Sequence, residues 1–333
     1  MDRIATGSAI ERRDLFRETA SRLGMNPAIV EKDFWVCWIL KHLFSEPTLK
    51  GQMVFKGGTS LSKVFGLIDR FSEDIDLILN WGLLGYGTDE GNDPYQTIQS
   101  KTKQSRYNQE MNTRAAEYIR GTLLGQLNQL FAIVPGIASS IDDIDPHTVN
   151  VSYPAAFAAE YIRPAVRLEI GPLASWIPSN VHTIQAYAAQ SFPAAFIDPT
   201  CAVVAIEAER TFWEKATILH QEAHRPGTIP VRYSRHYYDL HKLAESRVKR
   251  SALTDFALLR SVVNFKERFY YSSWARYDLA KPGSFRLTPP DNQIAALERD
   301  YRAMRDMFYK EPPEFSLILR SLQLLESEIN DSA

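Results

Sequence analysis

Two short stretches decide the fold expected of this chain: Phe-Lys-Gly-Gly-Thr-Ser-Leu at residues 55–61, and Arg-Phe-Ser-Glu-Asp-Ile-Asp-Leu at residues 70–77. The first stretch follows an apolar run that is typical of a strand. Gly57 and Gly58 then allow a tight turn, and residues 59–67 have helical apolar spacing. A helix that begins at a turn points its free N–H groups into that turn, where they favour a phosphate. The first stretch is therefore a candidate phosphate-binding turn.

The second stretch supplies a pair of carboxylates. A strand that begins near Asp74 has a side-chain period of two, so Asp74 and Asp76 share one face while Ile75 and Leu77 enter the core. Two carboxylates so placed repel each other unless a cation lies between them. Gly-Gly and Asp-x-Asp pairs are each common in ordinary turns and strands. In strand, turn, helix, strand order they are much more specific, and they make Asp74 and Asp76 candidate metal ligands.

This arrangement resembles the DNA polymerase β-type nucleotidyltransferase superfamily, whose signature is a Gly-Gly or Gly-Ser turn, a short helix, and Asp-x-Asp or Asp-x-Glu on the next strand. The exact residues of the two stretches indicate one family within this superfamily. They resemble the AbiEii/AbiGii toxin family, relatives of the MenT toxins. The resemblance implies an α+β fold. Residues 1–200 would hold N-terminal helices and a polymerase β-like nucleotidyltransferase core, a mixed sheet with flanking helices. Residues 201–333 would form a helical C-terminal domain that completes the active site.

The pattern along the chain agrees with this division. Two helices are expected between residues 11 and 44, with a break at Asn26-Pro27, because proline suits a first helical turn. Residues 149–153 and 165–170 alternate as half-buried strands do. In the second of these, Glu169 faces away from the apolar side chains. The superfamily places its third metal-site acid on such a strand, so Glu169 is the candidate; an ordinary exposed glutamate is the alternative. From Cys201 onward the pattern predicts that the sheet ends and helices follow.

The amino-acid composition excludes several classes of protein. The chain has 333 residues, 45% of them hydrophobic, a net charge of −2 and a pI of about 6.4, so it can bury a core and carries no global basic field. Cys37 and Cys201 are far apart, which argues against a disulfide framework or a zinc ribbon. No apolar run approaches the roughly 20 residues that span a bilayer, and no signal-peptide pattern is present. We therefore expect a cytoplasmic protein with no membrane partner.

Two later segments resemble the remaining motifs of the toxin family. One is helical and contains Glu214-Lys215; the other, residues 234–240, resembles an Arg-Asp-x-Tyr-Asp-Leu type sequence. Lys215 and Asp239 match by position, and Arg235 matches the leading basic residue. His236 stands where many relatives have the first aspartate, which puts any role of that acid in doubt. Lys215 is expected to hold a triphosphate, with Asp239 orienting Lys215 or Arg235; an ordinary salt-bridge network is the alternative.

Together the motifs predict metal-dependent nucleotidyl transfer. Two Mg²⁺ ions, or Mn²⁺, would be held by Asp74, Asp76 and Glu169. An acceptor hydroxyl would attack the α-phosphorus of an NTP, and pyrophosphate would leave. The catalytic set is completed by Lys215 and Asp239. The expected nucleotide-binding residues share a position in or near the glycine turn or in the later motif: Gly57, Gly58, Thr59, Ser60, Lys63, Ser72 and Arg235.

The family resemblance also implies a biological role, namely the toxin of a bacterial toxin–antitoxin or phage-defence system with a cognate antitoxin as partner. Some MenT enzymes add nucleotides to the 3′ end of tRNA, so tRNA is the expected acceptor. Residues 225–250 carry seven Lys and Arg against two acids, a local excess of five, with tyrosines interleaved. Such a segment suits RNA contact, although a solvated helix would have the same composition.

Two alternatives stay open from the residues alone. An enzyme of this fold could transfer the nucleotide to a protein or a small molecule, and a regulatory module could bind NTP without turnover. Other chemistries are disfavoured. His220 and His224 have metal-compatible spacing, but Gln221 replaces the catalytic Glu of the protease motif. There is no Gly-x-Ser-x-Gly elbow, and the only lysine next to the glycine pair, Lys56, precedes it, unlike that of a P-loop.

Overall fold

The computed structural model describes residues 1–72, 74–87, 94–95, 98, 100–157 and 162–332. The chain divides into two compact units. The first comprises Met1–Val64 and Glu73–Ile206, and the second comprises Phe65–Ser72 and Glu207–Ala333. The boundary expected after residue 200 falls inside the last strand of the first unit, which continues to Ile206.

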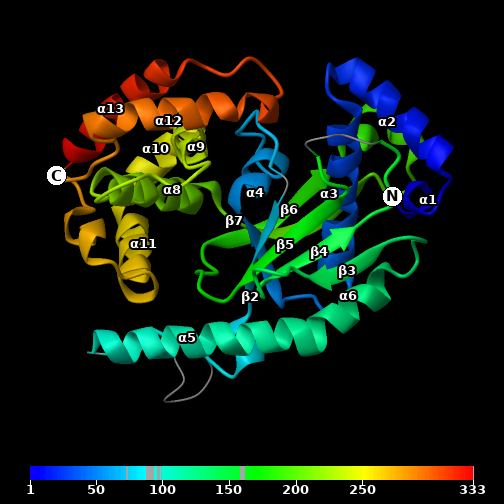
Figure 1. Cartoon of the computed structure of the whole chain (residues 1–333), viewed down its shortest axis with the longest axis horizontal. Coiled ribbons are helices and arrows are strands. Elements are labelled where there is room, and N and C mark those ends of the chain that lie inside the picture. Colours follow the sequence, from blue (N-terminus) through cyan, green and yellow to red (C-terminus); the bar gives the residue numbers. More distant parts are fainter. Residues whose placement is uncertain (73, 88–93, 96–97, 99, 158–161, 333) are drawn as a thin grey trace. The chain divides into compact units, whose positions relative to one another are not determined.

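A seven-stranded mixed sheet forms the first unit, in the order β3-β4-β5-β2-β1-β7-β6 (Figure 1). Strand β1 is antiparallel to β2 and parallel to β7, and β2 is parallel to β5. The remaining neighbours are antiparallel. The strands are β1 (Met53–Lys56), β2 (Asp74–Leu79), β3 (Ala138–Ile141), β4 (Thr148–Ser152), β5 (Ala165–Gly171), β6 (Ser179–Gln185) and β7 (Thr200–Ile206). This mixed sheet with flanking helices confirms the expected fold class.

Helices α2 and α3 form where the sequence predicts them. Ser8 and Glu11 make a capping box at the start of α2, and Asn26 caps α3 with Pro27 in its first turn. Helix α3 is buried along most of its length and packs against β5 and β7. The helices of this unit are α1 (Asp2–Ala5), α2 (Ala9–Leu23), α3 (Pro27–Ser45), α4 (Gly57–Lys63), α5 (Lys101–Tyr118), α6 (Leu124–Phe131) and α7 (Tyr187–Ser191), with a π-helical turn, Ile119–Leu123, between α5 and α6.

The expectation that the sheet ends before Cys201 is wrong. Strand β7 runs through Cys201 to Ile206 and lies between β1 and β6. Its pairing with β1 joins residues about 150 positions apart in the sequence, with Phe55 opposite Ala205. A short apolar run gives no periodicity that separates a buried strand from a helix segment. The tertiary contact with β1 therefore decides its structure.

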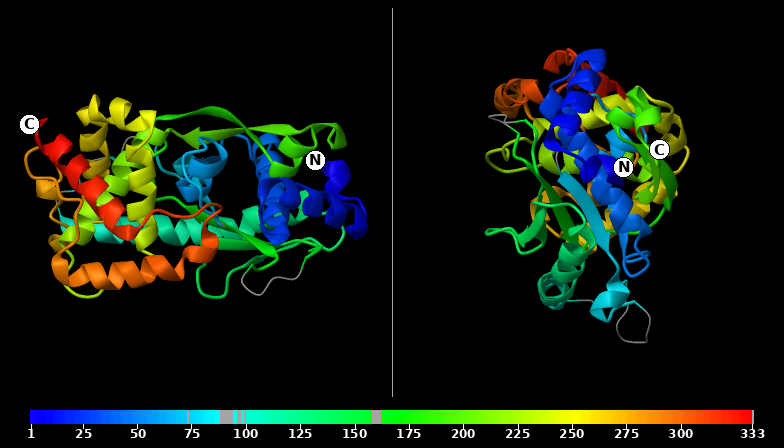
Figure 2. Two further views of the ribbon diagram at one scale, coloured as in Figure 1. Left: turned by 90° about the horizontal axis from the view of Figure 1, so that it is seen from above. Right: turned by 90° about the vertical axis from the view of Figure 1, so that its right-hand side faces the viewer.

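Helices make up the second unit: α8 (Ala208–Ala223), α9 (Ser234–Ala244), α10 (Arg247–Leu253), α11 (Phe256–Phe269), α12 (Asp291–Ala303) and α13 (Phe315–Asn330). Helix α8 packs against α9, α10 and α11, and α9 also packs against α12 and α13. Figure 2 shows these helices grouped together. Residues 65–72 belong to this unit because Phe71 N donates to Met307 O and Tyr309 N donates to Asp69 O.

Across the described residues, no helix has the length and apolar character needed to cross a lipid bilayer.

Candidate active site

Helix α4 follows β1 directly: Gly57 and Gly58 are its first two residues, and it ends at Lys63, short of the residues 59–67 expected from the sequence. Gly57 has φ +81°, a conformation that L-residues with a side chain rarely adopt. A Cβ atom built at Gly57 would overlap the carboxylate of Asp76. Position 57 therefore requires glycine for two reasons: its backbone conformation, and its close approach to the Asp76 side chain on β2.

Two hydroxyls fix the first turn of α4. Thr59 Oγ1 donates to the carbonyl oxygen of Asp74, and Ser60 Oγ donates to that of Gly57 at 2.9 Å. Both side chains are almost fully buried. The Thr59 hydroxyl therefore holds α4 against the start of β2, and the Ser60 hydroxyl closes the first turn of α4 on itself. Their predicted contact with a phosphate stays a prediction.

Lys63 lies at the last residue of α4 and has a protein partner. Its ammonium is 2.6 Å from Asp33 Oδ1 on α3, and both side chains are 5% exposed or less. Burial alone lowers the pKa of Lys63, but the adjacent Asp33 carboxylate outweighs this and raises the pKa above its usual value. The structure thus shows Lys63 as half of a buried ion pair, and its direct contact with a phosphate stays a prediction.

Strands β2 and β5 bring the three predicted acids to one face of the sheet. The parallel register sets Asp74 opposite Arg167 and Asp76 opposite Glu169. Ile75 and Leu77 are buried, as predicted, and so are the apolar neighbours of Glu169. Paired residues of adjacent strands point to the same face. The carboxylates of Asp74, Asp76 and Glu169 therefore share the polar face of the two strands.

Arg167 supplies positive charge to this face. Its guanidinium lies 3.6 Å from Asp74 Oδ1, 3.6 Å from Glu169 Oε1 and 3.0 Å from Asp142 Oδ2. Asp142 also accepts a hydrogen bond from Asn150 Nδ2 on β4. This bond and further ones from backbone N–H groups lower the pKa of Asp142 to about 2. Asp142 is therefore a fixed anion that holds Arg167 beside the acids. Sequence reasoning gave Arg167 no role, although its alternation with Glu169 places it on the same face.

In the part of the chain that the structure describes, no group of three or more His, Cys, Asp or Glu side chains is arranged to hold a metal ion. The pair Asp74 and Asp76 nevertheless offers the hard oxygen donors that Mg²⁺ prefers. Mg²⁺ is commonly bound by one or two carboxylates together with substrate phosphates and water. The residues present therefore fit a divalent ion that arrives with a nucleotide, and a ligand role for Glu169 stays a prediction.

The second unit brings Lys215 and Asp239 together, as predicted, and adds Arg70. Asp239 is fully buried and accepts from Arg70 Nε at 2.7 Å and Arg70 Nη2 at 2.8 Å. Its Oδ2 also lies 2.8 Å from Lys215 Nζ. Burial alone raises the pKa of Asp239, but Arg70 and Lys215 together lower it far below the usual value. The Asp239 carboxylate thus forms ion pairs with two buried cations, Arg70 and Lys215. Arg70 lies 169 positions from Asp239, so no local spacing could reveal the pair.

His236 contacts the same cluster. Its Nδ1 lies 3.1 Å from Lys215 Nζ. Burial, followed by the charge of Lys215, holds the pKa of His236 well below its usual value, so the imidazole is neutral and accepts from the ammonium. Burial likewise lowers the pKa of Lys215. Asp239 is therefore the carboxylate that contacts both Arg70 and Lys215, while His236 adds a neutral acceptor to the group.

Ser72 and Arg235 also lie in the second unit, in the 65–72 segment and at the second residue of α9 respectively. Both are partly exposed. The predicted nucleotide contacts of these two residues stay predictions. His220, one of the two disfavoured zinc candidates, has both ring nitrogens in hydrogen bonds to backbone groups, Arg276 O and Arg286 N.

Replacing Gly57 with alanine is expected to reduce nucleotidyl transfer at least about tenfold, because the new Cβ displaces the Asp76 carboxylate by a distance comparable to misplacements that cost 10²-fold in other enzymes. The left-handed conformation adds about 1–2 kcal/mol of destabilisation. Gly24→Ala is the matched control: Gly24 has φ +66°, but its added Cβ meets nothing within 4 Å. It should lose similar stability and keep its transfer rate. Equal transfer rates for the two variants, measured beside their thermal unfolding midpoints, would contradict the close approach.

Comparison with known proteins identifies the family. The family model described as "Nucleotidyl transferase AbiEii toxin, Type IV TA system" matches residues 38–321. Among solved structures, MenT4, a nucleotidyltransferase toxin from Mycobacterium tuberculosis H37Rv, is similar with 17% identity and a TM-score of 0.44, over 95% of this chain and 98% of that chain. Curated proteins give no match. Because the family model matches well over half of the 333 residues, the chain belongs to the AbiEii family, the nucleotidyltransferase toxins of type IV toxin–antitoxin systems.

Proposed function

We propose that this nucleotidyltransferase moves a nucleoside monophosphate from an NTP to the hydroxyl at the 3′ end of tRNA, and that Asp74, Asp76 and Glu169 form its catalytic face. The observation that carries the proposal is the register of β2 and β5, which sets Asp76 opposite Glu169. The glycine turn lies directly against Asp76. An anion-binding turn beside a carboxylate pair suits a substrate that carries both phosphates and a divalent ion.

Asp74 and Asp76 would hold the divalent ion, with Glu169 as a further oxygen ligand. Bound Mg²⁺, or Mn²⁺ in its place, would neutralise the charge of the triphosphate and lower the pKa of the attacking hydroxyl. Arg167 limits the repulsion among the acids, since its guanidinium lies 3.6 Å from both Asp74 and Glu169.

The turn would bind the phosphates through its backbone. Gly57 leaves room for the close approach, and the N–H groups of Gly58 and Thr59 belong to the first turn of α4. The hydroxyls of Thr59 and Ser60 fix the shape of the turn by donating to carbonyl oxygens. The backbone N–H groups are therefore preorganised, and they need no rearrangement when charge develops on the transferred phosphoryl group.

The second unit has its own candidates for phosphate contact. Lys215, Arg70 and Asp239 form a buried group with one more cation than anion. Asp239 orients the Lys215 ammonium, and a phosphate is the natural further partner of that ammonium. Arg235 and Ser72 are the other candidates for phosphate contact in this unit.

RNA as the acceptor is supported by the basic segment 225–250. Three of its seven cations form ion pairs inside the second unit: Arg225 with Glu222, Lys242 with Glu245, and Lys249 with Glu328. Of the other four cations, we propose Arg235, Arg247 and Arg250 as the RNA contacts. The family implies a cognate antitoxin as partner. With tRNA as its substrate, the toxin would act in the bacterial cytoplasm, in toxin–antitoxin regulation or phage defence.

The test is to incubate the purified protein with Mg²⁺, total bacterial tRNA and each α-labelled NTP in turn. Label on tRNA is the expected result, and the labelled nucleotide names the NTP. Label on protein or on a small molecule would overturn the choice of acceptor. NTP binding without any transfer would overturn the proposal altogether in favour of a regulatory module.

A further inference from the structure

A buried ion pair outside the proposed catalytic face joins Asp33 to Lys63. The ammonium lies 2.6 Å from Asp33 Oδ1, and the two side chains are 4% and 5% exposed. The pair lies between α3 and the last residue of α4. The proposed function gives this ion pair no part.

A third element is tied to the same pair. Asp33 Oδ2 accepts a hydrogen bond from Tyr187 N, the first residue of α7, at 2.7 Å, and the Lys63 ammonium lies 3.9 Å from the centre of the Tyr187 ring. Both oxygens of Asp33 therefore have donors. Separating these charges in a dry site is unfavourable, and this fixes the relative positions of α3, α4 and α7.

Helix α4 connects the Asp33–Lys63 pair to the segment that carries Asp74 and Asp76. It has seven residues, so its two ends are only about 10 Å apart. At one end, Lys63 is held by Asp33. At the other end, Gly57 lies against the Asp76 carboxylate, and Thr59 Oγ1 donates to Asp74 O. A short, stiff helix that is fixed at one end determines where its other end lies.

We propose that Asp33 is a positioning residue for nucleotidyl transfer: through Lys63 it fixes α4, and α4 in turn sets the placement of Asp76 and of the start of β2. The inference rests on the proposed function for what these carboxylates do, but the anchoring of α4 can be measured without any substrate.

The experiment compares wild-type protein with the Asp33→Asn and Lys63→Met variants by amide hydrogen exchange and by transfer kinetics. Loss of the pair should speed exchange at residues 57–63 at least about tenfold, since α4 then opens locally. Exchange in α2 should stay at the wild-type rate. Transfer should show a lower kcat/KM in Asp33→Asn, with most of the loss in kcat, because the carboxylates are displaced while the predicted nucleotide-binding residues are kept.

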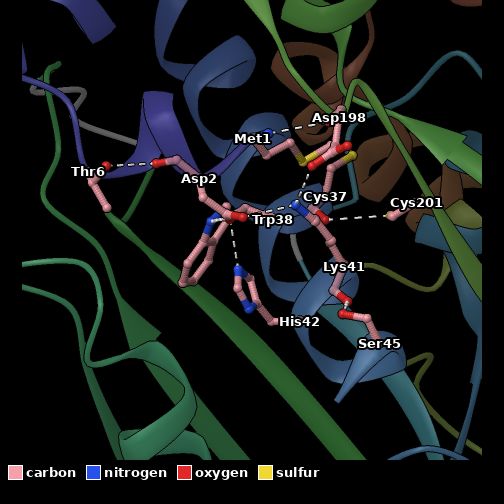
Figure 3. A network of polar contacts seen from close by, with 10 residues as sticks. All are labelled: Met1, Asp2, Thr6, Cys37, Trp38, Lys41, His42, Ser45, Asp198 and Cys201. Atoms are coloured by element: carbon pink, nitrogen blue, oxygen red, sulfur yellow. Dashed lines mark hydrogen bonds and ion pairs between the residues drawn. The ribbon is translucent and has the colours of Figure 1, made fainter. Parts of the chain in front are cut away.

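Asp2→Asn is the matched control, because it removes another aspartate–lysine pair from the same helix α3. Asp2 accepts hydrogen bonds from Trp38 Nε1, Lys41 Nζ and His42 Nε2, at 2.9 to 3.0 Å (Figure 3). These contacts link α1 to α3 and leave α4 untouched. The control should keep wild-type exchange at residues 57–63 and a wild-type kcat/KM.

Wild-type exchange at residues 57–63 in Asp33→Asn would overturn the proposal, and so would equal acceleration in Asp2→Asn. Acceleration spread over the whole first unit would also overturn it, because it would mark Asp33 as a general stabilising residue. If the wild-type protein transfers no nucleotide, the proposed function fails while the exchange result still decides whether Asp33 anchors α4.

Discussion

Asp76→Asn is expected to lower the rate of nucleotidyl transfer by about two to three orders of magnitude, the usual cost of removing one preorganised electrostatic group from an active site. Asparagine keeps the shape of the side chain but removes the charge that would hold a divalent ion. Asp76 is partly exposed on the polar face of β2, and the core residues on either side of it are unchanged. The fold should therefore survive, as thermal unfolding and circular dichroism would show.

The control for this variant is Asp198→Asn. Asp198 lies in the same unit, its carboxylate is 66% exposed, and its ion pair with Lys41 is long, at 3.8 Å. Its loss should leave the transfer rate within about twofold of wild type, since surface substitutions seldom change stability by more than ±0.5 kcal/mol. Transfer by Asp76→Asn at a rate near that of Asp198→Asn would remove Asp76 from the reaction.

The largest stability loss is expected for Asp239→Ala. This change leaves Arg70 and Lys215 buried without their carboxylate, and breaking a buried pair from one side costs about 3–5 kcal/mol. Because the pKa of Asp239 is lowered in the folded protein, its contribution is complete at neutral pH. The contribution should begin to shrink as the pH falls through about 3.9, the unfolded pKa of an aspartate. Urea unfolding at pH 7 and at acid pH measures both effects.

Glu245→Ala is the comparison for Asp239→Ala, because Glu245 immediately follows α9 and its side chain is 50% exposed. Its partners are Lys242 at 3.3 Å and His241 at 3.5 Å. An exposed pair of this kind contributes about 0–1 kcal/mol. Similar free energies of unfolding for the two variants would mean that the Arg70–Asp239–Lys215 group is as hydrated as a surface pair, contrary to its burial.

Local patterns predicted the centre of the fold. The glycine turn, β2 and β5 follow from periods and residue types within ten residues of one another, and the structure has them where they were expected. The edge strand β6 and the inner strand β7 were not predicted. In β6 both faces are partly exposed, so its alternation is weak, whereas β7 is a short apolar run whose partner β1 lies about 150 residues away. Pairing, not propensity, makes these segments strands.

The site shows the same limit. Sequence spacing placed Asp74 and Asp76 on one face because both lie on a single strand. It could not assign partners to the charged residues, since Arg70 meets Asp239 and Lys63 meets Asp33 only in the folded chain. In the sequence, Lys63 follows the glycine pair and is a candidate for phosphate contact. In the folded chain it is half of a buried ion pair with Asp33. The sequence shows which residues are charged, but the ion-pair partner of each one depends on tertiary packing.

The central claim is nucleotidyl transfer on the face that carries Asp76, and transfer with the same NTP labelled at either the α- or the γ-phosphate tests it most directly. Total tRNA is the acceptor, and wild type is compared with Asp76→Asn. We predict that α-label enters the acceptor with wild type, that γ-label leaves as pyrophosphate, and that both events are lost in the variant. Incorporation of γ-label, or α-label transfer that persists in Asp76→Asn, would contradict the account.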